Sequence, residues 1–533
     1  MIYLKQFGTT EEYEAAKSGL VLPYVALITD DTYSTYFEPY KKHPPTPPSP
    51  TKPNNIITYY SPVKLDDTTT EYTDCLHINS FSGNNGQQLT MINHSYKDGV
   101  GIIEFNDDIM TIGDSAFSNC RSVTSIEMPS SVTSIGDKAF YFCSGLTSVD
   151  IPSGVTNLGN NTFEYCVSIT SVTMSNRLTN IGSGAFKYSK SLTSVDLPTS
   201  LLTIGGSAFQ YCTSLTSITI PNSVISIGAN AFERCDSLRS CTFAEGSHLT
   251  SISNSFLKNC KRLTNVTLPS SISNIESCAF QYCEGLTKIN SSVEGVYNIP
   301  SGVIAIGAGT FAGCTRLTTI TLPSGVTTIS ESLFSGCSGL TSIELSTSTT
   351  NIDSLAFYGC SGLTAITLPN GITNIGHDAF YGCRGLENIH IPSSVTNISD
   401  SAFKACGITS CTFAEGIQLS AINGGVFADS NLPTISFPDS VTTIGKSAFN
   451  GSHLISIIIP SHITRIESMA FYNCRDLTSV TDLATTPPSL GGTIFGSPSG
   501  FNFPIYVPSE SVDLYKADLY WKKYADFIQA IPN

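Results

Sequence analysis

The stretch Ile151-Pro-Ser-Gly-Val-Thr-Asn-Leu-Gly159 decides the fold of this chain, together with its continuation through Phe163, Cys166 and Ile169-Thr-Ser-Val172. The same phrase returns along the 533 residues in the consensus form I-P-S-S-V-T-S-I-G-x-x-A-F-x-x-C-x-x-L-T-S-I-x. A fixed period in the twenties predicts a solenoid, because a unit of that length buries its apolar face only by stacking on its neighbours.

The phenylalanine of the phrase marks each unit. Most steps between units are 22 to 24 residues long, and one step, from Phe280 to Phe311, is 31 residues long. Seventeen phenylalanines predict seventeen coils: Phe117, Phe140, Phe163, Phe186, Phe209, Phe232, Phe256, Phe280, Phe311, Phe334, Phe357, Phe380, Phe403, Phe427, Phe449, Phe471 and Phe495.

Each coil contains a segment typical of a strand, as in Leu215-Thr-Ser-Ile-Thr-Ile-Pro221. Alternation places Ile218 and Ile220 inward, with Ser217 and Thr219 outward. The proline then ends the strand, because it has no N–H to donate. The predicted fold class is therefore a mainly β repeat solenoid, with coils of about 23 residues and a parallel sheet on one face.

The segments before the repeat divide into three parts. Residues 1–42 predict a small attachment module, with a capping box at Thr9 and strands over 21–29 and 33–37. Residues 43–55 are rich in proline and predict a semi-rigid spacer, or alternatively a ligand for a signalling domain. Residues 56–106 predict an N-terminal cap, since an exposed end coil presents an unpaired sheet edge.

The repeat is assigned to residues 107–500 and a C-terminal cap to residues 501–533, with a helix capped at Ser509. Trp521, the only tryptophan, lies in an aromatic cluster that predicts a plug for the last coil, or alternatively a ligand platform. The 31-residue step carries an insertion near 291–297. Insertions in repeats map to loops on one face, so this one is either a functional loop or a tolerated bulge.

The charge balance excludes some partners. The formal net charge is −15 and the pI is about 4.9, so neither nucleic acid nor an anionic membrane is an expected partner. We find no apolar run of about 20 residues, and hence expect no membrane insertion. The N-terminus also lacks the pattern of a secretory signal, so we expect synthesis in a cytoplasm.

Most of the seventeen cysteines lie three residues after the repeat phenylalanine, where Ser189, Ser430 and Ser452 stand in other coils. A column that accepts either residue predicts buried free thiols, because a free cysteine packs as a small hydrophobe. Ladder disulfides and metal binding remain alternatives. The scattered histidines and the absence of known catalytic motifs predict no catalytic residues, no metal and no cofactor.

The outward face of the predicted sheet is the candidate ligand-binding surface. It repeats short hydroxyl side chains, which can donate and accept hydrogen bonds and lose little entropy on binding. A few charged residues interrupt this neutral field and are candidates for specificity. Alternatively, the hydroxyls only keep a β surface soluble. The candidate residues are Glu127, Asp150, Asp196, Thr219, Thr267, Thr321, Glu344 and His390.

The combination C-x-x-L-T-S-I-x-L-P with I-G-x-x-A-F resembles the BspA-like class of leucine-rich repeats. The resemblance covers about residues 100 to 495 and implies an adhesin that binds host matrix proteins or other cells. We therefore expect a non-enzymatic binding protein whose partner is a cell-surface glycan or protein. The opening from Lys5 to Ile28 resembles proteins of Bacteroides and of their phages. That resemblance implies a virion or cell-surface location, with residues 1–42 attaching the chain to a carrier particle or partner protein.

These resemblances leave three hypotheses. The chain is a receptor-binding component of a phage tail or virion, a bacterial surface adhesin, or a structural spacer in an assembly.

Overall fold

The computed structural model describes residues 3–7, 24–28, 53–65, 76–291, 294, 296–496 and 503–532. The chain divides into two compact units, residues 1–53 and residues 54–533. In the first unit, β1 (Tyr3–Phe7) pairs in parallel with β2 (Tyr24–Ile28), and β2 falls within the strand predicted over 21–29. The predicted capping box, the strand over 33–37 and most of the proline-rich segment lie outside the described residues.

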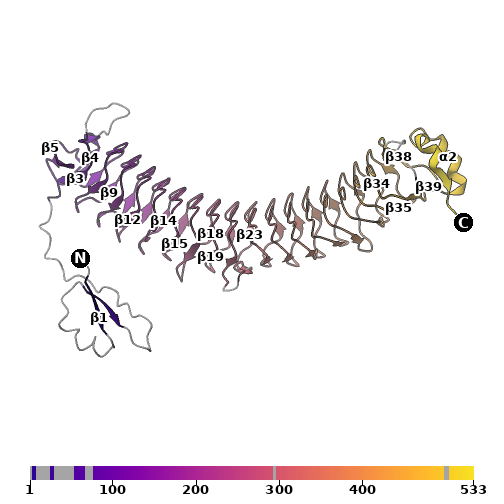
Figure 1. Cartoon of the computed structure of the whole chain (residues 1–533), viewed down its shortest axis with the longest axis horizontal. Helices are drawn as coiled ribbons and strands as arrows, with labels where there is room; N and C mark the ends of the chain where they lie inside the picture. Colours follow the sequence, from indigo (N-terminus) through magenta and orange to yellow (C-terminus); the bar gives the residue numbers. More distant parts are fainter. Residues whose placement is uncertain are drawn as a thin grey trace. The chain divides into compact units, whose positions relative to one another are not determined.

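The second unit is an elongated stack of coils with little helix (Figure 1), which confirms the predicted mainly β solenoid. Most coils contribute a strand to each of two faces, which we call the broad sheet and the narrow sheet; each is divided into several hydrogen-bonded segments, and the coils with Asp196 and Ile435 add no strand to the broad sheet. The broad sheet contains the Leu-Thr-Ser-Ile segments, and the narrow sheet contains the two-residue strands just before the glycine of the phrase.

The strands of the broad sheet are two to four residues long. They are β8 (Ser125–Glu127), β10 (Ser148–Asp150), β12 (Ser171–Thr173), β15 (Ser217–Ile220), β17 (Ser240–Phe243), β19 (Asn265–Thr267), β21 (Lys288–Ile289), β22 (Val296–Asn298), β24 (Thr319–Thr321), β26 (Ser342–Glu344), β28 (Ala365–Ile366), β30 (Asn388–Ile391), β32 (Ser410–Phe413), β35 (Ser456–Ile459), β37 (Ser479–Asp482), β39 (Ile505–Val507) and β40 (Ile528–Ala530).

The strands of the narrow sheet share the pattern of one outer residue followed by a buried aliphatic residue. They are β7 (Thr111–Ile112), β9 (Ser134–Ile135), β11 (Asn157–Leu158), β13 (Asn180–Ile181), β14 (Thr203–Ile204), β16 (Ser226–Ile227), β18 (Ser251–Ile252), β20 (Asn274–Ile275), β23 (Ala305–Ile306), β25 (Thr328–Ile329), β27 (Asn351–Ile352), β29 (Asn374–Ile375), β31 (Asn397–Ile398), β33 (Ala421–Ile422), β34 (Thr443–Ile444), β36 (Arg465–Ile466) and β38 (Ser489–Leu490).

The repeat phenylalanines form a buried stack inside the coils. Phe357, for example, lies between Phe334 and Phe380 with ring centroids 5.5 and 5.0 Å apart. The predicted position of Phe256 in this column is wrong. The Phe232 N–H donates to the Phe256 carbonyl, whereas the equivalent phenylalanine N–H in most other coils donates to an alanine carbonyl. Phe256 therefore stands in the alanine column, and Leu257 takes the place of the ring. This one-residue slip also explains why Cys260 follows Phe256 by four residues rather than three.

The cysteine column has a hydrogen-bonding role as well as a packing role. The Cys337 Sγ–H donates to the carbonyl of Phe311, one coil earlier, at 3.0 Å, and the Ser189 hydroxyl donates to the Phe163 carbonyl at 3.4 Å. The sixteen cysteines among the described residues are all free thiols. Burial raises the pKa of thiols such as Cys337 and Cys360, so the thiolate needed for disulfide exchange is disfavoured.

Both sheet edges at the start of the stack are covered by antiparallel strands. β5 (Met91–Lys97), β6 (Val100–Phe105) and β3 (Ile56–Tyr60) form a small sheet whose last strand pairs with β8 of the broad sheet. β4 (Phe81–Ser82), between the 3₁₀ turns η2 (Ile78–Ser80) and η3 (Asn84–Gly86), pairs with β7 of the narrow sheet. Pairing both edges removes the free backbone groups that promote aggregation.

The cap depends on a close approach that only glycine permits. Gly101 lies opposite Tyr59 in the β3–β6 pairing, and a Cβ on Gly101 would meet the Tyr59 ring at 1.9 Å. Tyr59 is fully buried, so its ring has no room to move away.

The inserted residues of the 31-residue step do not form only a loop. They add the strand β22, which pairs with β21 before it and β24 after it. Tyr297 of β22 is 1% exposed, and its hydroxyl donates to the Leu286 carbonyl. The narrow sheet gains no strand here, because β20 pairs directly with β23.

The C-terminal segment covers the last coil with aromatic side chains. After β39 come the 3₁₀ turn η5 (Ser509–Ser511), the helix α2 (Val512–Ala517) and η6 (Lys522–Phe527), so Ser511 rather than Ser509 precedes the α-helix. Trp521 is fully buried and its indole N–H donates to the Pro488 carbonyl at 2.9 Å. This burial agrees with a plug rather than a ligand platform.

Phe357→Ala tests the phenylalanine stack. The ring is fully buried between two stacked rings, so we expect the substitution to lower the free energy of unfolding by about 3–5 kcal/mol. The urea midpoint measures the effect, and Tyr358→Ala, at a neighbouring side chain that is 38% exposed, is the control. Equal, small effects of the two substitutions would show that the stack does not stabilise the solenoid.

Asp482, at the end of β37, is fully buried against the C-terminal cap. Its Oδ1 accepts a hydrogen bond from the Ala484 N–H at 3.0 Å, while its Oδ2 has no partner among the described residues. Burial raises the pKa of this carboxyl to about 7 from the ordinary value of 3.8.

Between these two pKa values the folded state binds more protons than the unfolded state, so stability falls as the pH rises from about 4 to about 7. We expect Asp482→Asn to be more stable than the natural protein at pH 8 and similar to it near pH 4, because the amide cannot ionise. Melting temperatures at both pH values measure this. A difference between variant and natural protein that does not change with pH would contradict it.

Candidate binding surface

The predicted site residues lie in one column on the outer face of the broad sheet. The pairing register joins Asp150 to Thr173, Thr219 to Thr242, Thr242 to Thr267 and Thr321 to Glu344, so the two residues of each pair stand one coil apart in the same column. Seven of the eight are exposed: Asp150, Asp196, Thr219, Thr267, Thr321, Glu344 and His390. Asp196 lies between described strands rather than within one.

Glu127 differs from the other seven because the N-terminal cap covers it. β8 pairs with β3, and the Tyr60 hydroxyl donates to the Glu127 carboxylate at 2.9 Å. The side chain is only half-exposed. The open part of the face therefore begins at Asp150.

The hydroxyl groups of the stack divide into two kinds. In many coils a threonine just before the broad-sheet strand donates to the backbone of the previous coil, as Thr147 does to the Thr124 carbonyl at 3.0 Å and Thr170 does to the Thr147 carbonyl at 3.1 Å. These hydroxyls connect coils. In the site column, Thr219 and Thr242 hydrogen-bond to each other at 3.1 Å between Oγ1 atoms, on the outer surface.

Among the members of the column that the N-terminal cap leaves open, the charged residues stand apart from one another. A neutral threonine separates Asp150 from Asp196, and Glu344 follows Thr321. His390 Nδ1 lies 3.0 Å from the Thr412 Oγ1 in the next coil, which orients the imidazole along the face. The surface can therefore supply isolated charges, hydroxyl groups and one imidazole to a ligand.

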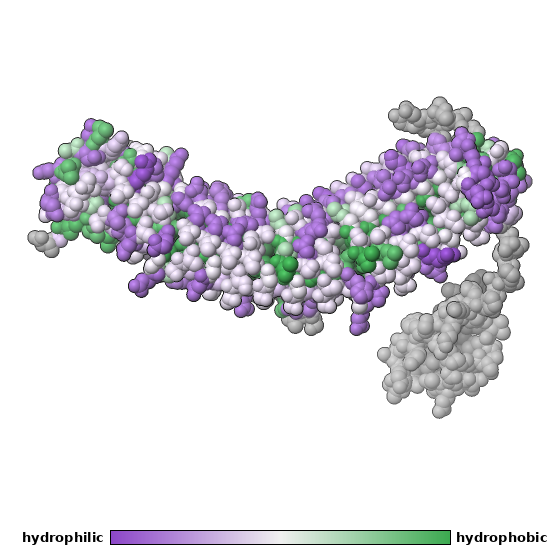
Figure 2. Space-filling view, turned by 180° about the vertical axis from the view of Figure 1, so that it is seen from behind, coloured by the Kyte–Doolittle hydropathy of each residue, from purple (hydrophilic) through white to green (hydrophobic). Residues whose placement is uncertain are grey.

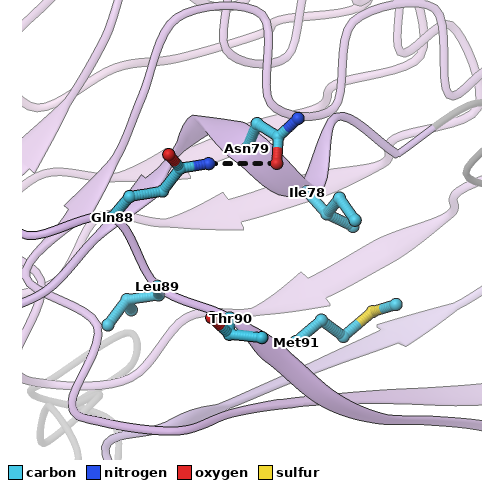
Figure 3. A pocket seen from close by; sticks show the side chains of 6 residues that line it. All are labelled: Ile78, Asn79, Gln88, Leu89, Thr90 and Met91. Carbon is cyan, nitrogen blue, oxygen red and sulfur yellow. Dashed lines mark hydrogen bonds between the residues drawn. The ribbon is translucent and has the colours of Figure 1, made fainter.

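A shallow cavity of about 360 Å³ lies in the N-terminal cap (Figure 3). Ile78, Asn79, Gln88, Leu89, Thr90 and Met91 line it, and the Gln88 side-chain amide donates to Asn79 Oδ1 at 3.0 Å. This lining contains no ionisable side chain. It offers no general base or nucleophile of the kind that acid–base or covalent catalysis requires.

Neither a metal cluster nor a membrane-spanning element is found in the described part of the chain. No three histidine, cysteine, aspartate or glutamate side chains there are arranged to hold a metal ion. Within the same residues, no helix has the length and apolar character needed to cross a membrane. Seen from behind, the stack is a mostly polar surface with small apolar patches (Figure 2).

Sequence reasoning missed a second surface feature, which we name the aromatic ridge: Phe142, Tyr165, Tyr188 and Tyr211. These half-exposed side chains stand two residues after the repeat phenylalanine in four consecutive coils. Their rings stack, with centroid distances of 4.3, 4.5 and 4.4 Å. The signal was present in the sequence, since aromatic residues recur every 23 residues at this position.

Cations lie at both ends of the aromatic ridge and beside it. The Arg121 guanidinium lies 5.4 Å from the Phe142 ring centroid, and the Arg234 guanidinium lies 5.4 Å from that of Tyr211. The Lys190 ammonium lies 6.0 Å from the Tyr188 centroid. These distances are in the range of cation–π attraction.

The aromatic ridge occupies a backbone position that suits glycine better. Tyr188 has φ of 61° and Tyr211 has φ of 62°, whereas Gly336 and Gly359 stand in the same column four or more coils later, with φ of 72° and 68°. A left-handed conformation costs a non-glycine residue roughly 1–2 kcal/mol. Ring stacking contributes about 0.5–1.5 kcal/mol per pair. The two effects are similar in size, so the ridge brings no evident net stability.

The comparisons with known proteins agree with this architecture. The chain matches the BspA type leucine rich repeat region over residues 91–216, 179–297, 290–409 and 396–483. No curated protein matches the chain by sequence. Among solved structures, a leucine-rich repeat protein from Bacteroides ovatus is 24% identical with a TM-score of 0.50, over 70% of this chain and 94% of that protein.

Two further solved structures are similar. A leucine rich cell surface protein from Faecalibacterium prausnitzii is 30% identical with a TM-score of 0.38, over 67% of this chain and 83% of that protein. The pneumococcal vaccine antigen PcpA is 18% identical with a TM-score of 0.35, over 82% of this chain and 87% of that antigen. The repeat phrase, the two parallel sheets and the match over residues 91–483 together show that the chain belongs to the BspA-type leucine-rich repeat family.

Proposed function

We propose that this protein is a non-catalytic binding protein that recognises a glycan or protein on a cell surface through the outer face of its broad sheet. The observation that carries the proposal is the exposed column from Asp150 to His390, in which a few charges stand among hydroxyl groups at fixed coil spacing. A rigid backbone holds these groups in place before binding, so little entropy is lost when a ligand contacts them.

A spacer role is the second candidate function. The threonine hydroxyls that bond to the previous coil favour it, because those groups already serve the stack itself. The exposed Asp150, Asp196 and Glu344 favour binding, since a spacer needs no isolated acid at particular coils of an otherwise neutral face.

We further propose that the protein acts at the surface of a virion or cell, with residues 1–42 as the attachment module. The resemblance of the opening segment to Bacteroides and phage proteins supports a tail or virion component. Family membership supports the alternative of a bacterial surface adhesin. The separation of residues 1–53 from the rest as a compact unit is consistent with either role.

The combined substitution Thr219→Lys, Thr267→Lys and Thr321→Lys tests the binding face. All three side chains are exposed, so we expect the melting temperature to change little. Three long cations should obstruct the face and weaken binding to bacterial cells or mucin-coated wells at least tenfold. Binding is measured with the fluorescently labelled full chain.

The matched control places the same charge beside the narrow sheet, through Thr156→Lys, Thr327→Lys and Thr373→Lys, which are exposed positions one residue before β11, β25 and β29. This control should bind like the natural protein. If both triple variants bound equally well, the broad sheet would be excluded as the binding site.

Deletion of residues 1–53 tests the attachment module. Because this segment forms its own compact unit, we expect the remaining chain to melt at nearly the same temperature. The shortened chain should no longer co-sediment with particles from the producing culture, while its binding to cells persists. A large fall in melting temperature would show instead that residues 1–53 stabilise the solenoid.

A further inference from the structure

The aromatic ridge lies in a part of the chain that does not share the negative charge of the rest. Residues 121–262 contain ten of the 27 Lys and Arg residues but only eight of the 42 Asp and Glu residues. Their formal charge is therefore +2, against −17 for the rest of the chain. Between Arg121 and Arg234, which mark the two ends of the ridge, six basic and six acidic residues balance. The ridge therefore lies in a neutral segment of an acidic protein, where its own cations can attract an anionic partner.

Three exposed cations at the aromatic ridge are free to meet such a partner. Arg121 and Arg234 lie over its two ends and Lys190 lies beside its centre, and within the described residues none of them forms an ion pair. The acids beside the ridge already have partners: Glu164 Oε1 lies 3.9 Å from the Lys187 Nζ, and Glu233 accepts hydrogen bonds from the Gln210 and Asn230 side chains.

The backbone of the aromatic ridge is strained without a steric need for aromatic rings. At Gly336 of the same column, an added Cβ would have its nearest neighbours, atoms of Gly313, 3.8 Å away, so no contact with the preceding coil requires an aromatic ring there. Four consecutive coils nevertheless place aromatic residues in a left-handed conformation. Asn119, Arg234 and Asn259 of the same column adopt this conformation too, so the run of four aromatic side chains, rather than the backbone, distinguishes the ridge.

From these observations we infer that the aromatic ridge binds an acidic polysaccharide, one that carries carboxylate or sulfate groups. This inference rests on the proposed function, which is recognition of a surface ligand. It adds a second binding site and names the chemical class of the ligand. The tyrosine hydroxyls donate and accept hydrogen bonds with sugar hydroxyls, the ring edges contact the apolar faces of sugar rings, and the cations pair with the acidic groups.

An extended peptide fits this surface less well. It presents side chains on one face only every ~6.6 Å, because the strand rise is about 3.3 Å per residue and alternate side chains point away. The rings of the ridge repeat every 4.3 to 4.5 Å. A peptide would therefore lose register with the ridge after one or two coils.

The test measures binding of the full chain to heparin, to polygalacturonate and to neutral dextran. We expect binding to one or both acidic polymers, no binding to dextran, and weaker binding as the salt concentration rises. Binding to heparin alone assigns sulfate as the recognised group, and binding to polygalacturonate alone assigns carboxylate. Equal binding to dextran, or no binding to either acidic polymer, overturns the inference.

Two sets of variants locate the site. Arg121→Gln, Lys190→Gln and Arg234→Gln together should weaken binding to the acidic polymer at least tenfold. The control set Arg316→Gln, Arg384→Gln and Arg475→Gln removes the same charge from exposed positions elsewhere in the stack and should change binding less than twofold. Equal losses in the two sets would mean that net charge alone attracts the polymer.

A third variant separates a polysaccharide from an acidic polypeptide. Tyr165→Phe, Tyr188→Phe and Tyr211→Phe together keep the stacked rings but remove the hydroxyls, and we expect a severalfold loss of polysaccharide binding. No loss, with equally tight binding to polyglutamate, would overturn the assignment to a polysaccharide. If the chain binds cells while the ridge variants bind them unchanged, this inference fails and the proposed function stands. If the natural chain binds neither cells nor polymers, the proposed function itself fails.

Discussion

Hydrogen bonding between neighbouring coils is the constraint on which the rest of the structure depends. The backbone N–H groups of each coil donate to the carbonyls of an adjacent coil, as Gly205 does to Ile181 at 2.8 Å and Phe186 does to Ala208 at 2.7 Å. A buried backbone group without a partner is costly, so no coil is stable outside the stack. The first and last coils therefore need a covering segment. A coil can contain extra residues where these residues pair with neighbouring strands, as β22 does.

The same register brings equivalent side chains of successive coils together. Asn351, Asn374 and Asn397 join through their amides along the narrow sheet, at 2.9 and 2.6 Å. Like charges placed in such a column would repel one another, whereas amides, hydroxyls and thiols can each donate to the next. This explains why the chain has only 13% charged residues. Each charged residue on the broad-sheet face therefore departs from the neutral side chains that fill most columns.

Two surfaces on one solenoid are consistent with a binding protein. The broad-sheet face is nearly neutral and offers isolated acids, whereas the aromatic ridge offers stacked rings between guanidinium groups. Later coils place Gly336 and Gly359 in the ridge column, so the ridge ends while the broad sheet continues. A repeat array can thus carry different surface chemistry along its length without any change in its core, because each coil contacts only its neighbours.

The sequence by itself determined the period, the mainly β solenoid and the inward position of residues such as Ile218, because a repeated apolar pattern has only one way to be buried. It also identified the Cys/Ser column, since exchange of two small side chains indicates a small buried site. The tertiary structure alone decided which residue enters which column. The step of four residues from Phe256 to Cys260 indicated a slip, but the aromatic residue of the phrase still favoured Phe256 as the ring position, and backbone pairing between coils assigned that position to Leu257. The burial of Tyr297 in an added strand, the cover over Glu127 and the stacking of Tyr188 on Tyr211 likewise depend on contacts between residues far apart in sequence.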